Sequence, residues 1–350
     1  MKLYYLISYF LYLFSFSTNA QGTSISEEKF ISIGGIEQWI TIKGEDRSKP
    51  VILFLHGGPG STMSQYQDTV YGYWKEDFIL VQWDQRGAGR TFGPTAPLEL
   101  SEDYLIKNPL TVEQMTNDGI ELSQYLIKYL GKKKIILIGT SWGSILGIKM
   151  ASKNPDIFYA YIGHSQFVNF SKNIDYAYLK VLEMARNAQD EESIKKLETL
   201  GKPPFDRARN TGQFLRIVKK YERENSVPAP DNWWKLAPEY DNAKDSSHRY
   251  TGDDYSFINL VGDDKLSIKS MVAEIDFNSD NLIFNIPIYL VQGDQDILTS
   301  KELNKPYFDK IKAPNKNYFL LDGAGHGHNQ AVVDTQYKIV KEYISPLIQE

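Results

Sequence analysis

Ser141 is the residue whose setting most clearly indicates chemistry, because it stands in Gly139-Thr140-Ser141-Trp142-Gly143. The apolar run 135–138 precedes this segment and a helix-forming run, 144–152, follows it, so the order predicts a strand, a sharp turn and a helix. Such a turn projects a serine hydroxyl above the end of a sheet. A serine hydroxyl is a weak nucleophile at neutral pH and needs a general base, together with a group that orients the base. The pattern therefore predicts nucleophilic catalysis by Ser141, assisted by a histidine and a carboxylate.

The base is expected late in the chain, because sites on such turns run in the order serine, acid, histidine. Of the five histidines, only His326 and His328 lie beyond the last acid candidate. His326 ends Asp322-Gly323-Ala324-Gly325-His326, and the glycines free this loop to reach back over the serine. We predict His326 as the base and keep His328 as the alternative. A metal site on the two histidines is disfavoured, because no acidic cluster of ligand spacing accompanies them.

The acid is expected just after the apolar strand 286–291, where Gly293-Asp294-Gln295-Asp296 offers two carboxylates. We predict Asp296, three residues past the glycine, as the group that orients the base. Asp294 is expected to stabilise the turn, which is a common role of aspartate.

The reaction also needs two N–H donors for the oxyanion of a tetrahedral intermediate. One is expected from Trp142, the residue that follows the serine. The other is expected from Gly58, in the segment His56-Gly57-Gly58-Pro59-Gly60, where the glycines leave the backbone open.

The elements that position these residues alternate between strands and helices. A hairpin is expected at 30–43, and apolar runs of strand length follow at 51–55, 78–83, 135–138, 158–162, 286–291 and 318–321. Continuous apolar runs are typical of strands that are buried on both faces. Helices are expected at 111–130, 144–152, 301–311 and 330–344. This alternation predicts an α/β fold whose mostly parallel sheet has helices on both faces.

A long polar region, 164–280, interrupts the pattern and divides the core into 21–163 and 281–350. We predict that it is an inserted helical cap. Gly-Asp-Asp occurs in it twice, at 252–254 and 262–264, and both are expected to be turns rather than calcium ligands. Trp233-Trp234 either lines a pocket or fixes the cap to the sheet.

The first twenty residues have the composition of a secretory signal peptide. Lys2 precedes an apolar stretch, 3–16, and Thr18 and Ala20 supply the small residues of a cleavage site. The stretch is shorter than the roughly 20 residues that a spanning helix needs. We therefore predict a signal peptide at 1–20, cleaved after Ala20. The protein would be exported to a periplasm or out of the cell, without a stable membrane anchor.

Composition narrows the kinds of chemistry further. The chain has no cysteine, which excludes disulfides, thiol nucleophiles and thiolate metal sites. A formal net charge of -5 without a long basic run gives no indication of nucleic-acid binding. No cofactor is expected, and the sequence does not specify an oligomeric state.

Three motifs together resemble those of one enzyme family. His56-Gly57-Gly58-Pro59-Gly60, the run 84–91 (DQRGAGRT) and Gly139-Thr140-Ser141-Trp142-Gly143 are similar to the proline iminopeptidase (prolyl aminopeptidase) family of α/β-hydrolases. The resemblance covers 30–169 and 286–326 and fades across the cap. It implies an α/β-hydrolase fold and the release of an N-terminal residue, typically proline, without a metal. Carried over by motif, the family's triad falls on Ser141, Asp296 and His326, and its oxyanion donors fall on Gly58 and Trp142.

The chain departs from this family in places that concern the substrate. Thr140 stands where glycine is usual, and Ala88 lies where cysteine or serine is frequent. The family recognises the substrate's amino terminus with cap glutamates, because a cationic amine in a dry pocket needs a carboxylate partner. The cap glutamates of this chain match no family motif and are expected to be solvated: Glu183, Glu191, Glu192, Glu198, Glu222, Glu224, Glu239 and Glu274.

These observations lead to a first hypothesis and two alternatives. The first is an exported serine aminopeptidase that releases N-terminal proline or another small residue from short peptides through an acyl-enzyme. The alternative is a carboxylic-ester or lactone hydrolase with the same triad, whose substrate is a small ester. A non-catalytic binding protein is disfavoured by the complete set of serine, acid and base. Epoxide hydrolases and haloalkane dehalogenases are disfavoured because they place aspartate where Ser141 stands.

Overall fold

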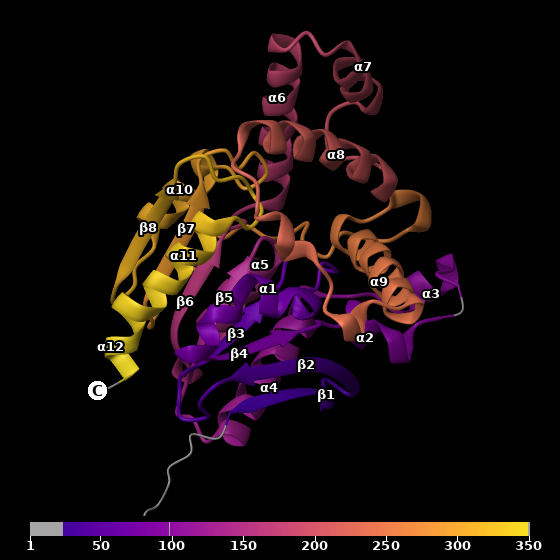
Figure 1. The fold of residues 1–350 in the computed structure, drawn as a ribbon. Helices are drawn as coiled ribbons and strands as arrows, with labels where there is room; N and C mark the ends of the chain where they lie inside the picture. Colours follow the sequence, from indigo (N-terminus) through magenta and orange to yellow (C-terminus); the bar gives the residue numbers. More distant parts are fainter. Residues whose placement is uncertain (1–23, 98, 349–350) are drawn as a thin grey trace, which may run out of the picture.

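The computed structural model describes residues 24–97 and 99–348, so the signal peptide predicted at 1–20 lies outside the described residues. Within these ranges the chain forms a central sheet that is covered by helices, with a further group of helices beyond one end of the strands (Figure 1). The strands of this sheet, as far as the structure describes the chain, are β1 (Ile25–Ile33), β2 (Ile36–Gly44), β3 (Val51–Leu55), β4 (Ile79–Trp83), β5 (Ile135–Thr140), β6 (Phe158–His164), β7 (Ile288–Gly293) and β8 (Lys316–Leu321).

The α-helices fall into those that come between β6 and β7 in the chain and those that lie elsewhere in the chain. The helices outside the β6–β7 connection are α1 (Gln67–Tyr71), α2 (Gly89–Phe92), α3 (Glu102–Lys107), α4 (Val112–Leu130), α5 (Trp142–Lys153), α10 (Lys301–Lys310), α11 (Gln330–Ile339) and α12 (Ser345–Ile348). The others are α6 (Phe170–Asn187), α7 (Glu191–Leu200), α8 (Ala208–Asn225) and α9 (Ala243–Val261). The helix predicted at 330–344 is α11 followed by a π-helical turn, Val340–Ile344.

The sheet has the order β1-β2-β4-β3-β5-β6-β7-β8. β1 and β2 form the predicted antiparallel hairpin, which turns at Gly34-Gly35, and β2 pairs antiparallel with β4. From β4 to β8 every neighbouring pair is parallel. The predicted mostly parallel sheet is therefore confirmed. Because these strands point the same way, the loops that follow β3, β5, β7 and β8 meet at one edge.

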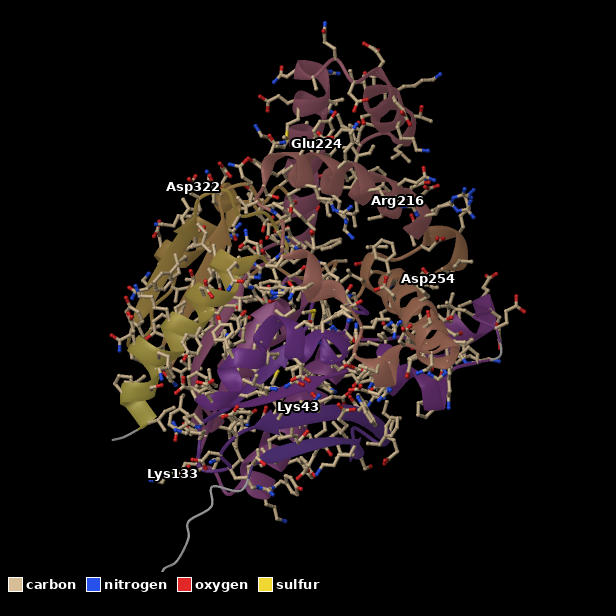
Figure 2. All side chains as sticks on the ribbon, viewed as in Figure 1. Lys43, Lys133, Arg216, Glu224, Asp254 and Asp322 are labelled. Atoms are coloured by element: carbon tan, nitrogen blue, oxygen red, sulfur yellow. The ribbon has the colours of Figure 1, made fainter. Side chains whose placement is uncertain are left out.

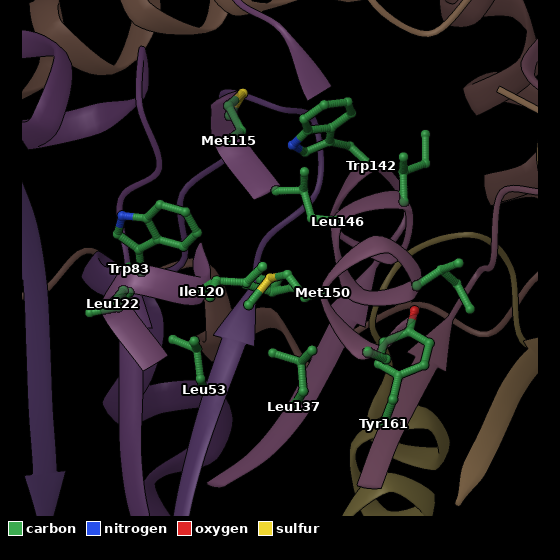
Figure 3. Close-up of a cluster of buried hydrophobic side chains, with 14 of the residues drawn as sticks. Leu53, Trp83, Met115, Ile120, Leu122, Leu137, Trp142, Leu146, Met150 and Tyr161 are labelled. Atoms are coloured by element: carbon green, nitrogen blue, oxygen red, sulfur yellow. The ribbon is translucent and has the colours of Figure 1, made fainter. Parts of the chain in front are cut away.

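The inner strands bury both of their faces, as their continuous apolar sequences indicate. Leu53, Trp83 and Leu137 pack on one face against Met115 and Leu122 of α4 and Leu146 and Met150 of α5, as Figure 3 shows. The alternate strand residues, such as Phe54, Leu80 and Ile138, point to the other face. There they pack with Tyr71 of α1 and Val333 of α11. This two-sided core makes the sheet a rigid platform for the loops at its edge.

The group of helices between β6 and β7 has a hydrophobic cluster of its own. Tyr178 of α6, Leu197 of α7 and Phe214 of α8 belong to this cluster, which Ile297 of the core also joins. α9 differs from these helices, because its residues Tyr255 and Leu260 pack into the main core. The region 164–280 therefore contains two packing units, with α6, α7 and α8 in one and α9 in the other.

The prediction of two Gly-Asp-Asp turns was half wrong. Residues 252–254 lie inside α9, and only 262–264 form a turn, which ends that helix at Gly262. Gly252 lies at a close approach of α9 to the core, because a side chain there would begin 3.0 Å from the Gly87 carbonyl oxygen and 3.2 Å from Phe92 Cβ. None of the helices described is long and apolar enough to cross a membrane.

Candidate active site

Ser141 lies at the sharp turn between β5 and α5, as predicted. Its backbone has φ 53° and ψ -121°, a combination that is strained for a residue with a side chain. The strain is held by two hydrogen bonds: the Ser141 N–H donates to the His164 carbonyl oxygen at 3.0 Å, and the Ser144 N–H donates to the Ser141 carbonyl oxygen at 2.8 Å. A side chain at Gly143 would place its first carbon 2.1 Å from the Leu55 carbonyl oxygen, so glycine is required there.

The structure brings Ser141, His326 and Asp296 into one chain of contacts. His326 Nε2 lies 2.8 Å from Ser141 Oγ. On the other side of the ring, His326 Nδ1 lies 3.1 Å and 3.2 Å from the two carboxylate oxygens of Asp296. Ser141, His326 and Asp296 stand on the loops after β5, β8 and β7, which lie at the same edge of the sheet because the strands from β5 to β8 are parallel. This arrangement is suited to a hydroxyl nucleophile with a base and an orienting acid.

Asp296 is held in place by Thr299, a residue that the sequence analysis did not single out. The Thr299 N–H donates to one carboxylate oxygen at 2.7 Å and the Thr299 hydroxyl donates to the other at 2.5 Å. Burial alone would raise the pKa of Asp296, but the charge of His326 and these hydrogen bonds outweigh it, and the pKa lies well below its usual range. Asp296 is thus held ionised behind the imidazole. Its spacing to Thr299 is that of a local side-chain-to-backbone turn, which could have been foreseen.

The pKa of His326 moves in the opposite direction. Burial would lower the pKa of this imidazole, but the charge of Asp296 and its hydrogen bond outweigh burial and raise it above the ordinary value. The ring is therefore a stronger base than a free imidazole. Its main chain is fixed as well, because the Ser165 hydroxyl donates to the His326 carbonyl oxygen at 2.9 Å.

The three sequence motifs form one hydrogen-bonded unit around the serine. The Trp142 indole donates to the Gln85 side-chain oxygen at 2.9 Å, and the Gln85 side-chain amide donates to the His56 carbonyl oxygen at 3.1 Å. The Gln85 N–H also donates to His56 Nε2 at 3.2 Å. Burial lowers the pKa of His56 to about 4, so its ring is neutral. Gln85 of the run 84–91 therefore links the glycine-rich loop to the serine turn.

Trp142 follows Ser141 in the chain, and the glycine-rich loop that contains Gly58 lies against Ser141. Trp142 is the first residue of α5, where backbone N–H groups have no partner within the helix. In the glycine-rich loop, Gly57 lies directly against Ser141, since a side chain there would begin 3.2 Å from Ser141 Cβ. Gly58 follows with φ +100° and packs over Ser61. The assignment of the two donors to Gly58 and Trp142 remains a prediction.

His328, the alternative base, points away from the carboxylate. Its Nε2 lies 3.0 Å from the Tyr71 hydroxyl and 3.5 Å from the Thr140 hydroxyl. Its ring also lies 5.0 Å from that of His164, whose two ring nitrogens have no hydrogen-bond partner in the part of the chain that the structure describes. Burial lowers the pKa of His328 to about 4, so it is neutral at neutral pH. In residues 24–97 and 99–348, no group of three or more histidine, aspartate or glutamate side chains is placed to hold a metal ion.

One of the eight cap glutamates, Glu222, differs from the others. The other seven are exposed, whereas Glu222 is only 8% exposed and accepts a hydrogen bond from the His326 N–H. Burial and repulsion by Asp296 raise the pKa of Glu222 to about 7. The expectation that every cap glutamate is solvated was therefore wrong for Glu222. A signal was present, because Glu222 stands four residues after buried Val218, on the apolar face of α8.

The end of α8 is attached to the loop that carries His326. The Val227 N–H donates to the Gly323 carbonyl oxygen at 2.7 Å, and the Asn329 side chain donates to the Val227 carbonyl oxygen at 3.2 Å. Elsewhere, Trp233 is buried in the core and Trp234 is exposed against Tyr66. Of the two roles considered for Trp233-Trp234, Trp233 therefore has the second, since it fixes the cap to the core.

The fold and the motifs agree with comparisons against known proteins. A family model described as "alpha/beta hydrolase fold" matches residues 50–328. A probable aminopeptidase of Bacillus subtilis, YbaC, is 27% identical over 87% of this chain and 91% of its own length. A proline iminopeptidase of Lactobacillus helveticus is 22% identical over 89% of this chain and 95% of its own length.

Solved structures show the same fold with more distant sequences. The proline iminopeptidase of Mycobacterium smegmatis aligns with a TM-score of 0.61 at 16% identity, over 92% of this chain and 99% of that chain. An epoxide hydrolase of Vigna radiata aligns with a TM-score of 0.52 at 17% identity, over 92% and 98%. At such identities a structural likeness shows the fold alone. The chain belongs to the alpha/beta hydrolase fold family and is an enzyme of the serine hydrolase type, with proline iminopeptidases among its relatives.

Proposed function

We propose that this enzyme is an exported serine aminopeptidase that releases N-terminal proline or another small residue from short peptides. The observation that carries the proposal is the placement of Glu222, a buried cap carboxylate, beside the chain of contacts from Asp296 through His326 to Ser141. An aminopeptidase needs an anion close to its nucleophile, because the substrate amine is only two bonds from the carbonyl carbon under attack. The names of the curated relatives support the same reading.

The reaction begins when Ser141 Oγ attacks the carbonyl carbon of the N-terminal residue and His326 Nε2 takes its proton. Asp296 stabilises the cationic ring, and the N–H groups of Trp142 and Gly58 hold the oxyanion. His326 then returns the proton to the leaving nitrogen, the C–N bond breaks, and an acyl-enzyme ester remains on Ser141. Water attacks this ester with His326 as the base, and the released N-terminal residue leaves Ser141 Oγ protonated again.

Glu222 binds the substrate ammonium in this proposal. Its pKa of about 7 and the ordinary pKa of a peptide amine, about 8, set a window in which both partners are charged. Binding of the ammonium favours the ionised form of Glu222 and so widens the window toward acid pH. We therefore expect the KM for substrates with a free amine to rise as the pH falls below about 7.

The test compares free and blocked amines in matched variants. We expect the wild-type enzyme to cleave prolyl or alanyl arylamides, to reject the N-acetylated forms, and to lose this activity in Ser141→Ala. Glu222→Gln keeps an acceptor for the His326 N–H but removes the charge, so kcat/KM for the free-amine substrate should fall by roughly tenfold to a hundredfold. Glu224→Gln, an exposed neighbour on α8, is the control and should behave like the wild type (Figure 2).

Failure takes a clear form. If no arylamide is cleaved across a broad panel of N-terminal residues, the aminopeptidase proposal is wrong. Rapid turnover of small esters that needs no amine would then support the ester hydrolase alternative. Export is tested separately, by expressing the full chain and sequencing the N-terminus of the exported protein. A mature protein that begins at Gln21 supports the proposed signal peptide, and retention of the intact chain inside the cell contradicts it.

A further inference from the structure

The first residue after β6, Ser165, connects the sheet to the loop that carries the base. Its hydroxyl donates a hydrogen bond to the His326 carbonyl oxygen at 2.9 Å. Its N–H donates to the carbonyl oxygen of Val291, in the neighbouring strand β7, at 3.2 Å. Ser165 itself is fully buried. This residue therefore holds the main chain of His326 against two parallel strands of the sheet, β6 and β7.

The backbone of Ser165 has a conformation that residues with side chains rarely adopt. Its φ is 51°, close to the 53° of Ser141. Glycine adopts such a φ without a steric penalty, whereas a residue with a side chain is strained there. Serine at this position is therefore less favourable for the backbone than glycine. What serine adds is the hydroxyl, and with it the hydrogen bond to His326 that glycine could not form.

The residues that follow in the chain connect this segment to the nucleophile. The Phe167 N–H donates to the Ser144 hydroxyl at 3.0 Å, and the Ser144 hydroxyl donates to the Ser141 carbonyl oxygen at 2.5 Å. The Phe167 ring also packs edge-on against the His326 ring, with 6.4 Å between the ring centroids. The segment 165–167 therefore contacts both the serine turn and the base, and it is placed to fix the separation between them.

The two main-chain polar groups of His326 are bound by two different parts of the fold. The carbonyl oxygen accepts from Ser165, which follows a strand of the sheet. The N–H donates to Glu222, which belongs to α8 of the cap. Because the sheet is a close-packed platform that also carries Ser141, the contact with Ser165 holds the base at a fixed place relative to the nucleophile. In this arrangement His326 Nε2 lies 2.8 Å from Ser141 Oγ.

We propose that Ser165 is a positioning residue, whose hydroxyl fixes the main chain of His326 so that the imidazole meets the Ser141 hydroxyl. The proposal rests on the triad of the proposed function and does not depend on the identity of the substrate. Without the Ser165 hydroxyl, the His326 loop has a wider range of positions, and the imidazole takes the proton of Ser141 less effectively. A misplacement of about 1 Å can cost a factor of about a hundred in rate, so we expect a loss of roughly tenfold to a hundredfold.

The test measures how fast a fluorophosphonate forms an adduct on Ser141 in the full-length protein. Ser165→Ala and Ser165→Gly both lack the hydroxyl and should be labelled roughly tenfold to a hundredfold more slowly than the wild type. With an ester or arylamide that the wild type cleaves, the loss should fall on kcat and leave KM nearly unchanged, because Ser165 acts through His326. Ser267→Gly is the matched control and should be labelled at the wild-type rate, since Ser267 has a φ of 56° but is exposed in the turn after α9.

Thermal unfolding separates the effect of the hydroxyl from that of the backbone strain. Glycine relieves the strain at φ 51° and alanine keeps it, so Ser165→Gly should unfold at a higher temperature than Ser165→Ala. Both variants should nevertheless be labelled at the same reduced rate, because both lack the hydrogen bond to His326. If Ser165→Ala does not fold, Ser165→Gly alone carries the comparison with the wild type.

A wild-type rate of labelling in both Ser165→Ala and Ser165→Gly overturns the role of Ser165 and leaves the triad intact. Recovery of the rate in Ser165→Gly alone also overturns it, because the loss in Ser165→Ala would then come from backbone strain. A wild-type protein that forms no adduct on Ser141 overturns the triad itself, and with it the proposed function.

Discussion

His326 and His328 are two residues apart in one loop, and their surroundings give them opposite properties. His326 faces Asp296, which raises its pKa, and its other nitrogen contacts Ser141. His328 faces Tyr71, Thr140 and the buried ring of His164, and its pKa is lowered to about 4. In the described part of the chain, the contacts of the His328 ring are with Tyr71, Thr140 and His164, which carry no negative charge. The comparison teaches that the carboxylate behind the ring, and not the distance from the nucleophile alone, decides which histidine can serve as a base.

The largest expected effect comes from exchanging each histidine for glutamine. His326→Gln removes the base and should lower kcat by about 10⁴-fold or more. His328→Gln should lower kcat by less than about tenfold, since it removes only a contact behind the serine turn. Steady-state kinetics on one arylamide checks both. An equal loss of kcat in His326→Gln and His328→Gln would contradict the different roles of the two histidines.

The next effect concerns the carboxylate that distinguishes the two rings. Asp296→Asn should lower kcat by about 10⁴-fold, because the amide favours the wrong tautomer of His326 and cannot stabilise its cation. Asp322→Asn, at an exposed position in the same region, is the control and should retain activity. If Asp296→Asn keeps more than a tenth of the wild-type kcat, another group must orient His326.

The surroundings of His326 could be predicted from the sequence to a greater extent than those of His328. The sequence indicated the residues on the His326 side of the loop because each follows an apolar strand, and parallel strands bring their following loops together. These residues are Ser141, Asp296 and His326. The surroundings of His328 could not be predicted from the sequence. Tyr71 and His164 belong to no motif and contact His328 only through tertiary packing. Glu222 was missed for a related reason. Its approach to His326 depends on how α8 docks, and helix polarity alone does not specify the docking.

His328 should also make the free energy of unfolding depend on pH. The folded pKa of His328, about 4, is below the unfolded value of about 6.5, so the unfolded chain binds the extra proton between these values. The free energy of unfolding therefore falls as the pH drops through this window. His328→Gln should make the loss between pH 7 and pH 5 smaller by about 2 kcal/mol. Urea unfolding at the two pH values checks this, and an unchanged difference would contradict a neutral, buried His328.

The smallest expected effect is a shift of the pH–rate profile. Because the pKa of His326 is raised and the base must be neutral, kcat/KM should rise with pH through a value above 6.5. The residual activity of Asp296→Asn should show this limb at lower pH, since the raising charge is gone. A substrate without an amine separates this limb from that of Glu222. A wild-type limb below pH 6 would contradict the raised pKa.

The central claim is that Ser141 is a nucleophile activated by His326. It is tested most directly by reaction of the folded protein with a fluorophosphonate, followed by mass spectrometry of the intact chain and of its peptides. We predict a single adduct on Ser141, which forms at a comparable rate in His328→Gln and is strongly slowed in His326→Gln. Absence of an adduct on Ser141, or equal labelling rates in His326→Gln and the wild type, would contradict the account.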